Sequence, residues 1–190
     1  MDKPLILQVS ADIRLELINE HHAEELFACI DANRAHLGQF LPWVGFMNVV
    51  ADVSAYIQTC KKLQEEDKEI SFVIIYQNKL AGRIGLHHIQ MANRSAAIGY
   101  WLAKTAVGKG IMLNSCKKLI DHGFGAMALN RIEIKAATQN LSSQAIPEKL
   151  NFIKEGIMRQ AEVVNNNFLD LVLYSMLREE WQERQSLQNL

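Results

Sequence analysis

Two glycines in the middle of the chain, Gly108 and Gly110, flank Lys109 where the apolar pattern changes from strand to helix. Residues 98–102 alternate, with aromatic and branched side chains that suit a pleated strand. Apolar residues from 112 to 127 then recur at helical spacing. A glycine turn before a helix leaves backbone N–H groups without intrahelical partners, and the helix dipole adds positive charge there. This stretch therefore predicts an anion site where a phosphate can approach the backbone.

Two common nucleotide-binding loops do not fit this stretch. The dinucleotide pattern G-x-G-x-x-G requires a third glycine where the chain has Leu113. The Walker A pattern requires glycine at Ala103 and serine or threonine at Gly110. Residues 107–112 instead resemble the pyrophosphate loop of GNAT-superfamily acyltransferases, Q/R-x-x-G-x-G/A, and match it at Gly110.

Composition bounds the class of protein. The chain has 190 residues, of which 49% are hydrophobic and 22% charged, so we expect one compact soluble domain over residues 1–190 with a core at about 10–182. A net charge of −1 gives no general attraction to nucleic acid or to an anionic membrane. Three separated cysteines and no His/Cys cluster predict reduced thiols and no metal site. The N-terminus lacks a signal-peptide pattern, and no apolar run approaches the roughly 18 residues of a membrane span, so we expect a cytoplasmic location.

The elements that must position the glycine loop follow from apolar periodicity and turn residues. They are a strand at 13–17, helices at 21–33 and about 49–66, and an antiparallel meander of strands at 71–76, 79–87 and 95–102. A helix after the loop is expected to end near residues 129–130, so the next strand, 132–136, should run parallel to 95–102. Then come a short helix through Lys149, strands at 152–158 and 168–177, and a charged helical tail over 178–190. Ser142 or Ser143 is the expected N-cap of the short helix, which puts Pro147 near its first turn.

This order is that of the GNAT superfamily, and three stretches make the resemblance specific. N-R-A-H-L-x-x-F-L-P-W at 33–43, N-R-S-A-A-I-G-Y-W-L at 93–102 and the long run at 129–162 are similar to the RimJ/RimL branch of ribosomal-protein N-terminal acetyltransferases. The similarity covers roughly residues 10–182. It implies a mixed α/β GNAT fold, in which an antiparallel meander is followed by a parallel pair around a helix-capped pyrophosphate loop. It also implies acetyl-CoA as co-substrate and no metal.

The resemblance implies roles for individual residues. Asn140 would contact the cofactor, Ser143 would contact it and protonate the departing thiolate, and Glu162 would take a proton from the amine, directly or through water. The strand before the loop would lend backbone groups to the pantetheine arm, and the loop would give N–H groups to the pyrophosphate, with the lysine as a counter-charge. The strand residues are Gly99, Tyr100, Trp101 and Leu102, and the loop residues are Val107, Gly108, Lys109, Gly110, Ile111 and Met112.

The chemistry explains why such groups are needed. Acetyl transfer from a thioester requires a neutral amine, and an α-amine has a reference pKa of about 8. A carboxylate, alone or through water, can relay that proton. A backbone N–H of a splayed strand can stabilise the oxyanion, and the leaving thiolate needs a donor. We expect acetyl-CoA to bind between the strands at 99–102 and 132–136.

Each of these residues also has a plain structural explanation. Glu162 in isolation is a solvated loop acid, Ser143 a helix cap and Asn140 a turn residue. The large side chains of Phe40, Leu41 and Trp43 are either a core plug or the wall of a substrate-binding cleft.

The leading hypothesis is acetyl transfer to a primary amine, namely the N-terminal α-amine of a protein or peptide such as a ribosomal protein. One alternative keeps the fold but acetylates a small amine, such as a polyamine, an amino acid or an antibiotic. An acidic cleft, formed if Glu16, Glu162 and Asp170 converge, would favour a polycation. A second alternative is a non-catalytic acyl-CoA-binding sensor, since Val107 and Met112 depart from the loop pattern. We expect no nucleic-acid or membrane partner, and the family suggests a homodimer or higher homo-oligomer.

Overall fold

The computed structural model describes residues 5–188, so the predicted domain bounds of 1 and 190 lie outside the described residues. Most predicted elements are present, although several end elsewhere, and the structure adds a short first strand and a short second helix that were not predicted. In chain order they are β1 (Ile6–Gln8), β2 (Ile13–Leu17), α1 (Ala23–Asp31), α2 (Arg34–Leu37), α3 (Val50–Glu65), β3 (Ile70–Tyr76), β4 (Lys79–Gln90), β5 (Ser95–Leu102), α4 (Ile111–Phe124), β6 (Arg131–Ala137), α5 (Leu141–Lys149), β7 (Ile153–Val164), β8 (Asn167–Leu177) and α6 (Arg178–Gln188).

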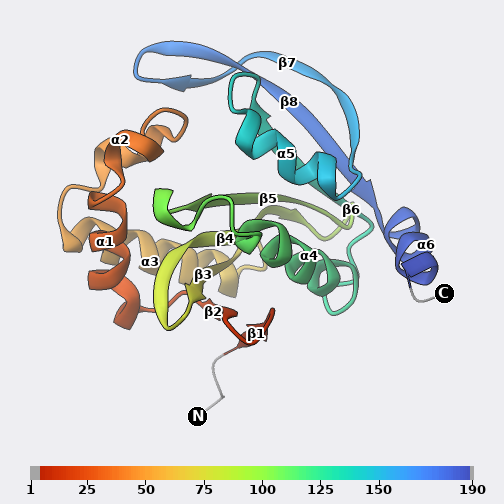
Figure 1. The fold of residues 1–190 in the computed structure, drawn as a ribbon, viewed down its shortest axis with the longest axis horizontal. Helices are drawn as coiled ribbons and strands as arrows, with labels where there is room; N and C mark the ends of the chain where they lie inside the picture. Colours follow the sequence, from red (N-terminus) through yellow and green to blue (C-terminus); the bar gives the residue numbers. More distant parts are fainter. Residues whose placement is uncertain (1–4, 189–190) are drawn as a thin grey trace.

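The strands form one mixed sheet of order β1-β2-β3-β4-β5-β6-β8-β7. Only β5 and β6 pair in parallel among the described strands, as the helical crossover between them requires. Their pairing stops at Ile98 and Ile134. Beyond that point β5 continues on β4 as far as Leu102, and β6 continues on β8 as far as Ala137. The sheet therefore splits into two arms, and the β7–β8 hairpin arches above the gap (Figure 1).

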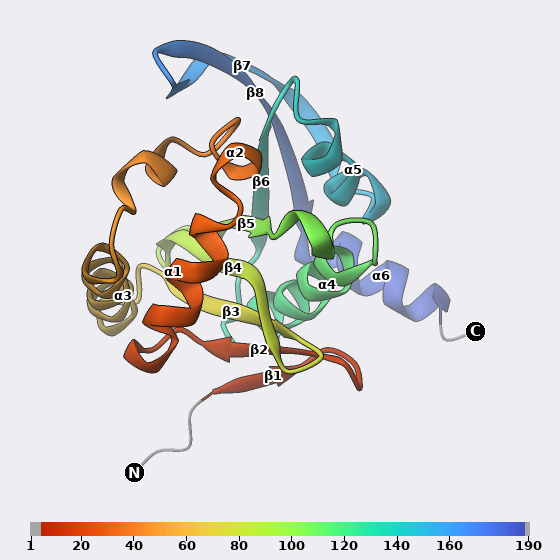
Figure 2. The ribbon, with the colours of Figure 1, turned by 60° about the vertical axis from the view of Figure 1, so that its left-hand side comes forward.

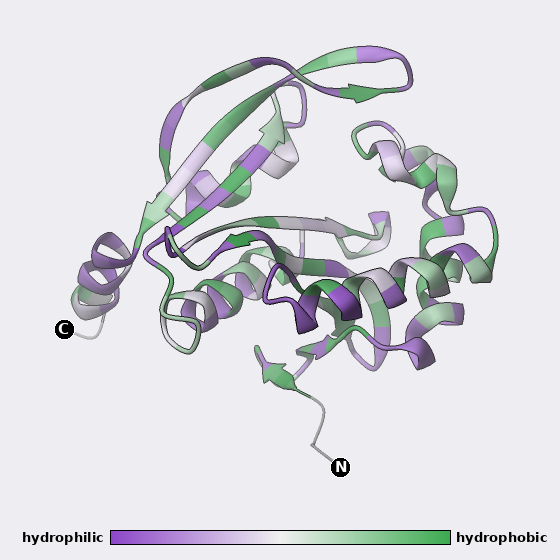
Figure 3. Cartoon of the chain, turned by 180° about the vertical axis from the view of Figure 1, so that it is seen from behind, coloured by the Kyte–Doolittle hydropathy of each residue, from purple (hydrophilic) through white to green (hydrophobic). Residues whose placement is uncertain are grey.

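Two apolar cores hold the sheet, one on each face. Helices α1 and α3 cover one face of the central strands and α4 covers the other (Figure 2). The continuous apolar run of β3 serves both cores, because Phe72 packs toward α4 and the neighbouring Val73 toward α1 and α3. Both side chains are fully buried, and each such burial stabilises the fold by about 1.5–3 kcal/mol. In the hydropathy colouring of Figure 3, the β7–β8 hairpin alternates between hydrophilic and hydrophobic residues, and Val172, Tyr174 and Met176 of β8 are buried in the core on the α4 face.

Helix α4 ends at Phe124, five or six residues before its predicted end at 129–130. The chain leaves the helix at Gly125 and turns through Ala128, which has a φ of +51°. Leu129 then packs back as a fully buried side chain, and its N–H bonds the carbonyl of Gly123 at 3.0 Å. The sequence pattern predicted a longer helix because this turn returns Leu129 to the core that α4 packs on, so the apolar spacing continues beyond the last helical residue.

The predicted caps of α5 are wrong. Asn140 is the N-cap, and its side-chain oxygen accepts the Ser143 N–H at 3.1 Å. Pro147 lies inside the helix rather than in its first turn. The strands are also longer than predicted in places: β4 runs to Gln90 and β7 to Val164, and β1 has no counterpart among the predicted elements.

Candidate active site

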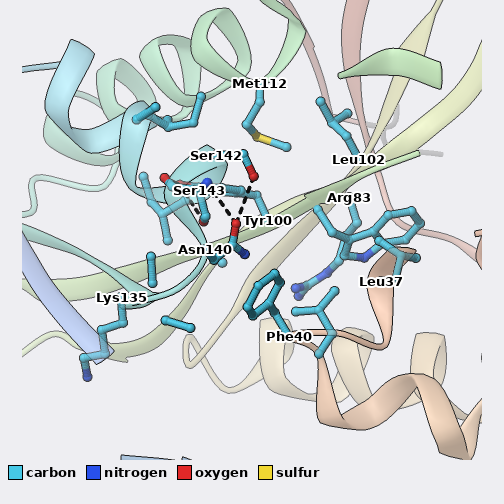
Figure 4. Close-up of a pocket in the computed structure, with 18 of the residues that line it drawn as sticks. Leu37, Phe40, Arg83, Tyr100, Leu102, Met112, Lys135, Asn140, Ser142 and Ser143 are labelled. Atoms are coloured by element: carbon cyan, nitrogen blue, oxygen red, sulfur yellow. Dashed lines mark hydrogen bonds between the residues drawn. The ribbon is translucent and has the colours of Figure 1, made fainter. Parts of the chain in front are cut away.

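The gap between β5 and β6 opens into a cleft of about 750 Å³ (Figure 4). All but one of the predicted site residues line it. They are Phe40, Leu41, Trp43, Gly99, Tyr100, Trp101, Leu102, Val107, Gly108, Gly110, Ile111, Met112, Asn140, Ser143 and Glu162. The exception is Lys109, whose ammonium group lies over the ring of Tyr76, 5.5 Å from its centroid, and does not line the cleft.

The glycine loop has the conformation that an anion-binding turn needs. Gly108 and Gly110 have φ angles of +81° and +73°, a region that favours glycine. A Cβ at Gly108 would meet nothing within 4 Å, so the backbone is open to a ligand. Within residues 5–188, the N–H groups of residues 108–113 have no backbone or side-chain acceptor. Since they also sit at the N-terminus of α4, these donors fit a pyrophosphate, and neither Val107 nor Met112 contributes a side chain to that fit.

Opposite the loop, Asn140, Ser143 and Tyr100 form a hydrogen-bonded group. The amide oxygen of Asn140 accepts from the Ser142 hydroxyl at 2.9 Å and from the Ser143 N–H at 3.1 Å, which fixes the amide plane at the cleft. The Ser143 hydroxyl donates to the Tyr100 hydroxyl at 3.3 Å. Burial raises the pKa of the Tyr100 hydroxyl, so both hydroxyls carry their protons at neutral pH. The cleft therefore contains a protonated hydroxyl pair between β5 and α5.

Pro147 explains how Tyr100 is held. A residue at position 147 would normally donate its N–H to the carbonyl of Ser143, four residues earlier, but proline has no N–H. The Tyr100 hydroxyl takes that place and donates to the Ser143 carbonyl at 2.8 Å. The proline inside α5 thus frees an acceptor that connects the helix to β5.

Tyr174 on β8 does not offer a further hydroxyl to the cleft. Its single hydroxyl proton lies between two acceptors, Glu148 Oε1 at 3.0 Å and Gln144 Oε1 at 3.3 Å, and the side chain does not line the cleft. Burial and the Glu148 carboxylate raise the pKa of Tyr174 to about 12.

Glu162 reaches the cleft through an irregularity in β7. The pairing of β7 with β8 shifts register between Met158 and Glu162, and the backbone at Gln160 has a φ of +50°. The Asp170 carboxylate accepts the Gln160 N–H at 2.7 Å and stabilises this bulge. Glu162 is half-buried, and burial raises the pKa of its carboxyl above the ordinary value of 4.5. A carboxylate of this kind is a better proton acceptor than a solvated one.

Aromatic side chains line the other end of the cleft. Phe40, Leu41 and Trp43 precede α3, and the ring of Trp43 packs at 6.0 Å from that of Trp101. The core-plug and cleft-wall explanations are therefore both partly right, because Leu41 and Trp43 pack on the core beneath α1 and α3, and all three side chains line the cleft. The tip of the β7–β8 hairpin closes over them: the Asn165 amide donates to the Gly38 carbonyl at 2.9 Å.

The charged side chains that line the cleft are mostly basic. Its charged lining residues are Arg83, Lys135, Lys149 and Glu162. Glu16 lies on β2, where it pairs with Arg14 at 2.6 Å, and Asp170 is committed to the bulge. The three acids considered from the sequence therefore do not converge, and nothing in the described lining favours a polycation.

Sequence reasoning missed Arg83 and Lys135, and it favoured a structural over a catalytic role for the histidine pair at 87–88. His87 and His88 line the cleft, and burial together with the neighbouring charges lowers the pKa of His87 to about 4, so its ring is neutral at pH 7. The signal for Arg83 was present in the sequence, because a charged residue between the glycines at 82 and 85 interrupts an apolar strand.

In the part of the chain that the structure describes, one cluster has ligand atoms close enough for a metal ion. Single donor atoms of Glu16, His21 and His22 lie within 4.8 Å of one another. Two of the groups already have protein partners. His22 Nδ1 accepts the Asn19 N–H at 3.1 Å, and its Nε2 lies 3.2 Å from Glu16. An imidazole that accepts at Nδ1 carries its proton on Nε2, so that nitrogen has no lone pair for a cation.

The cleft and fold define an acyltransferase of the kind that takes a phosphate-bearing acyl donor between two diverging strands. The model of the acetyltransferase (GNAT) domain matches residues 12–153, and the chain belongs to this family. It is an acetyl-CoA-dependent N-acetyltransferase. In the described residues, no helix has the length and apolarity to cross a membrane.

Named relatives match almost the whole chain. "Putative ribosomal N-acetyltransferase YdaF" of Bacillus subtilis (strain 168) is 36% identical over 92% of this chain and 96% of its own length. The ribosomal-protein-serine acetyltransferase of Escherichia coli (strain K12) is 30% identical over 90% of this chain and 96% of its own.

Solved structures agree with these relatives. RimL, the ribosomal L7/L12 alpha-N-protein acetyltransferase, in complex with coenzyme A superposes with a TM-score of 0.89, at 29% identity over 93% of this chain and 99% of that one. The microcin C7 self-immunity acetyltransferase MccE, in complex with acetyl-CoA and AMP, superposes with a TM-score of 0.85. It is 31% identical over 89% of this chain and 94% of its own.

Proposed function

We propose that this enzyme transfers the acetyl group of acetyl-CoA to the N-terminal α-amine of a protein, with a ribosomal protein as the acceptor class. The observation that carries the proposal is the split between β5 and β6. It gathers the open loop, the Ser143–Tyr100 hydroxyls and Glu162 around one cleft. The names of the relatives, three of which refer to ribosomal substrates, support the acceptor class.

The residues that would hold acetyl-CoA are those of the cleft's loop side. The free N–H groups of residues 108–113 would bind the pyrophosphate, and the edge of β5 beyond Ile98, which has no β6 partner, would bind the pantetheine arm. Bound in this way, acetyl-CoA supplies the thioester carbonyl that the amine attacks. A backbone N–H on the free edge of β5 would stabilise negative charge on the carbonyl oxygen.

Two groups would move the protons. Glu162, with its raised pKa, would take a proton from the acceptor amine, directly or through water. The Ser143 hydroxyl would give its proton to the sulfur, and the Tyr100 hydroxyl to which it donates holds that proton in place until then. No side chain needs to form a covalent bond with the acetyl group.

Thiol release from acetyl-CoA tests this function. The panel contains peptides with free and blocked N-termini, polyamines, free amino acids, and an aminoacyl-nucleotide analogue, which represents the AMP-bound relative. We expect release with free peptide N-termini only. Release with a small amine but no peptide would overturn the acceptor class. Tight acetyl-CoA binding without release across the panel would mean a sensor rather than an enzyme.

We also propose that the protein works in the cytoplasm, where ribosomal-protein acceptors are made, and that it forms a homodimer. Large exposed side chains such as Phe168 and Ile157 on the β7–β8 hairpin support a contact between copies. Light scattering on the purified protein gives its molar mass in solution. The mass of a single chain at micromolar concentration would contradict the proposed dimer.

A further inference from the structure

A charged side chain lies on the floor of the cleft, in the middle of the sheet. Arg83 on β4 pairs in register with Trp101 on β5, and its side chain is only 15% exposed. The Glu69 carboxylate lies 2.6 Å from its Nη2, and the Ser71 hydroxyl lies 2.5 Å from the same nitrogen. The Tyr56 ring packs against the guanidinium, 5.6 Å from ring centroid to Cζ. These contacts hold the group firmly, but they use only one of its three nitrogens.

The other two nitrogens of Arg83 have no acceptor. Nε is buried without a hydrogen-bond partner, and no acceptor within residues 5–188 bonds Nη1. A guanidinium that served only to fix the fold would have its donors satisfied by the protein, because a buried unpaired donor costs about 1–3 kcal/mol. Here the unpaired donors belong to a residue that lines the cleft.

Gly99 shows which part of the cleft Nη1 of Arg83 faces. A Cβ at this position would lie 4.0 Å from Arg83 Nη1 and 3.0 Å from His87 Nε2. Glycine therefore leaves a space beside the β5 backbone, bounded by the guanidinium and a neutral imidazole. Gly99 is also the first residue of β5 beyond its last pair with β6, so this space lies where the two strands separate.

We propose that Arg83 is a specificity-determining residue that binds a carboxylate of the acceptor. The enzyme then prefers amines that carry an acidic group close to the reactive nitrogen, above all a peptide N-terminus with an acidic second residue. Nη1 supplies two charge-assisted N–H donors to that carboxylate, while Glu162, which lines the same cleft, receives the proton of the amine. The inference rests on the proposed function, because it concerns the same cleft and the same acceptor.

Matched acceptors test the preference. The peptides Ala-Glu-Ala, Ala-Gln-Ala and Ala-Lys-Ala, amidated at the C-terminus, differ only in the second side chain. Free alanine and alaninamide test an α-carboxylate as the source of the anion. For the wild type we expect a kcat/KM about tenfold or more higher for the Glu peptide than for the Gln peptide, and lowest for the Lys peptide, as one charge-assisted hydrogen bond predicts.

The variant of choice removes both charges of the buried pair. Arg83→Met combined with Glu69→Met leaves no orphaned charge, and such replacements often keep a protein folded. We expect the ratio of kcat/KM for the Glu peptide to that for the Gln peptide to fall to about one in this double variant. Arg83→Lys should retain part of the preference for the Glu peptide. Arg131→Met is the matched control, because Arg131 is also held by carboxylates, at 3.0 and 2.6 Å, but does not line the cleft. It should leave the ratio unchanged.

Two results would overturn the role of Arg83: a wild-type ratio near one, or a ratio that persists in the double variant. A preference for alanine over alaninamide that disappears in the double variant would support Arg83 and make a free amino acid the source of the carboxylate. If no acceptor releases CoA, the proposed function fails. The Glu/Gln ratio of dissociation constants, measured by calorimetry on CoA-saturated protein, then decides the role of Arg83 by the same criterion.

Discussion

The Tyr100 hydroxyl and the Ser143 carbonyl are joined by a 2.8 Å hydrogen bond that exists because Pro147 has no N–H to offer that carbonyl. The same tyrosine oxygen receives the proton of the Ser143 hydroxyl at 3.3 Å. Pro147, although proline usually breaks helices, thus helps to position Ser143, the candidate proton donor. These two hydrogen bonds connect the strand that borders the cleft to the helix that carries the candidate donor.

Tyr100→Phe should slow the reaction without unfolding the protein. It removes the acceptor of the Ser143 proton and the donor to the Ser143 carbonyl, but it keeps the packing of the ring. We expect kcat to fall about tenfold to a hundredfold, less than the roughly 10²–10⁴-fold that general acid catalysis contributes, because Ser143 keeps its own proton. Steady-state kinetics with Ser143→Ala and the double variant provide the check. If the two losses multiply independently, the hydroxyls do not act as a pair.

Glu162→Gln should change both the pH profile and the stability. Burial raises the pKa of Glu162 above 4.5, so the folded state binds this proton at a higher pH than the unfolded state. Its contribution to stability is therefore present at low pH and is lost as pH rises through the folded pKa. The variant should unfold at a slightly higher temperature at pH 7, lose the acidic limb of kcat/KM, and lose about a hundredfold or more in kcat. An unchanged kcat and pH profile would remove Glu162 as the base.

Asn165→Gly should loosen the closure over the acceptor end of the cleft. It removes the amide that bonds the Gly38 carbonyl, while glycine tolerates the φ of +50° at this position. We expect the KM for the peptide to rise a few-fold with little change in kcat or in acetyl-CoA affinity. Asn166→Gly is the control, since Asn166 has a similar φ of +61° and its side chain makes no hydrogen bond within the described residues. Equal effects of the two changes would mean that backbone flexibility, not the bond, is responsible.

Gly110→Ala should weaken acetyl-CoA binding through the backbone alone. A Cβ there would meet only the Asn114 side chain, at 3.7 Å, but the φ of +73° costs an alanine about 1–2 kcal/mol. We expect a lower melting temperature and a dissociation constant for acetyl-CoA that is about tenfold higher or more. Gly45→Ala, also in open space but without a positive φ, should leave both quantities nearly unchanged. Calorimetry and thermal unfolding on both variants make the comparison.

Local chemistry explains which parts of the fold were predictable. The strand periods of β2, β3 and β5, the amphipathic spacing of α3, and the glycine loop each depend on residues within a few positions of one another. The errors arose where a distant contact replaced a local one. The end of α4 depends on Leu129 folding back, and Pro147 is tolerated inside α5 because Tyr100, far away in the sequence, bonds the carbonyl that it frees.

The sequence by itself determined the class of the protein, because the strand, glycine turn and helix at 98–116 and the motifs around them are contiguous and carry their own backbone requirements. Only the tertiary structure decided what the cleft presents to an acceptor. Glu162 enters it through a bulge that Asp170 stabilises, and Arg83 is held there by Glu69, the residue just before β3. The Lys109 side chain does not line the cleft, and its ammonium group lies over the ring of Tyr76. Side-chain direction at a bulge and the pairing of buried charges depend on groups from separate strands, so no spacing along the chain specifies them.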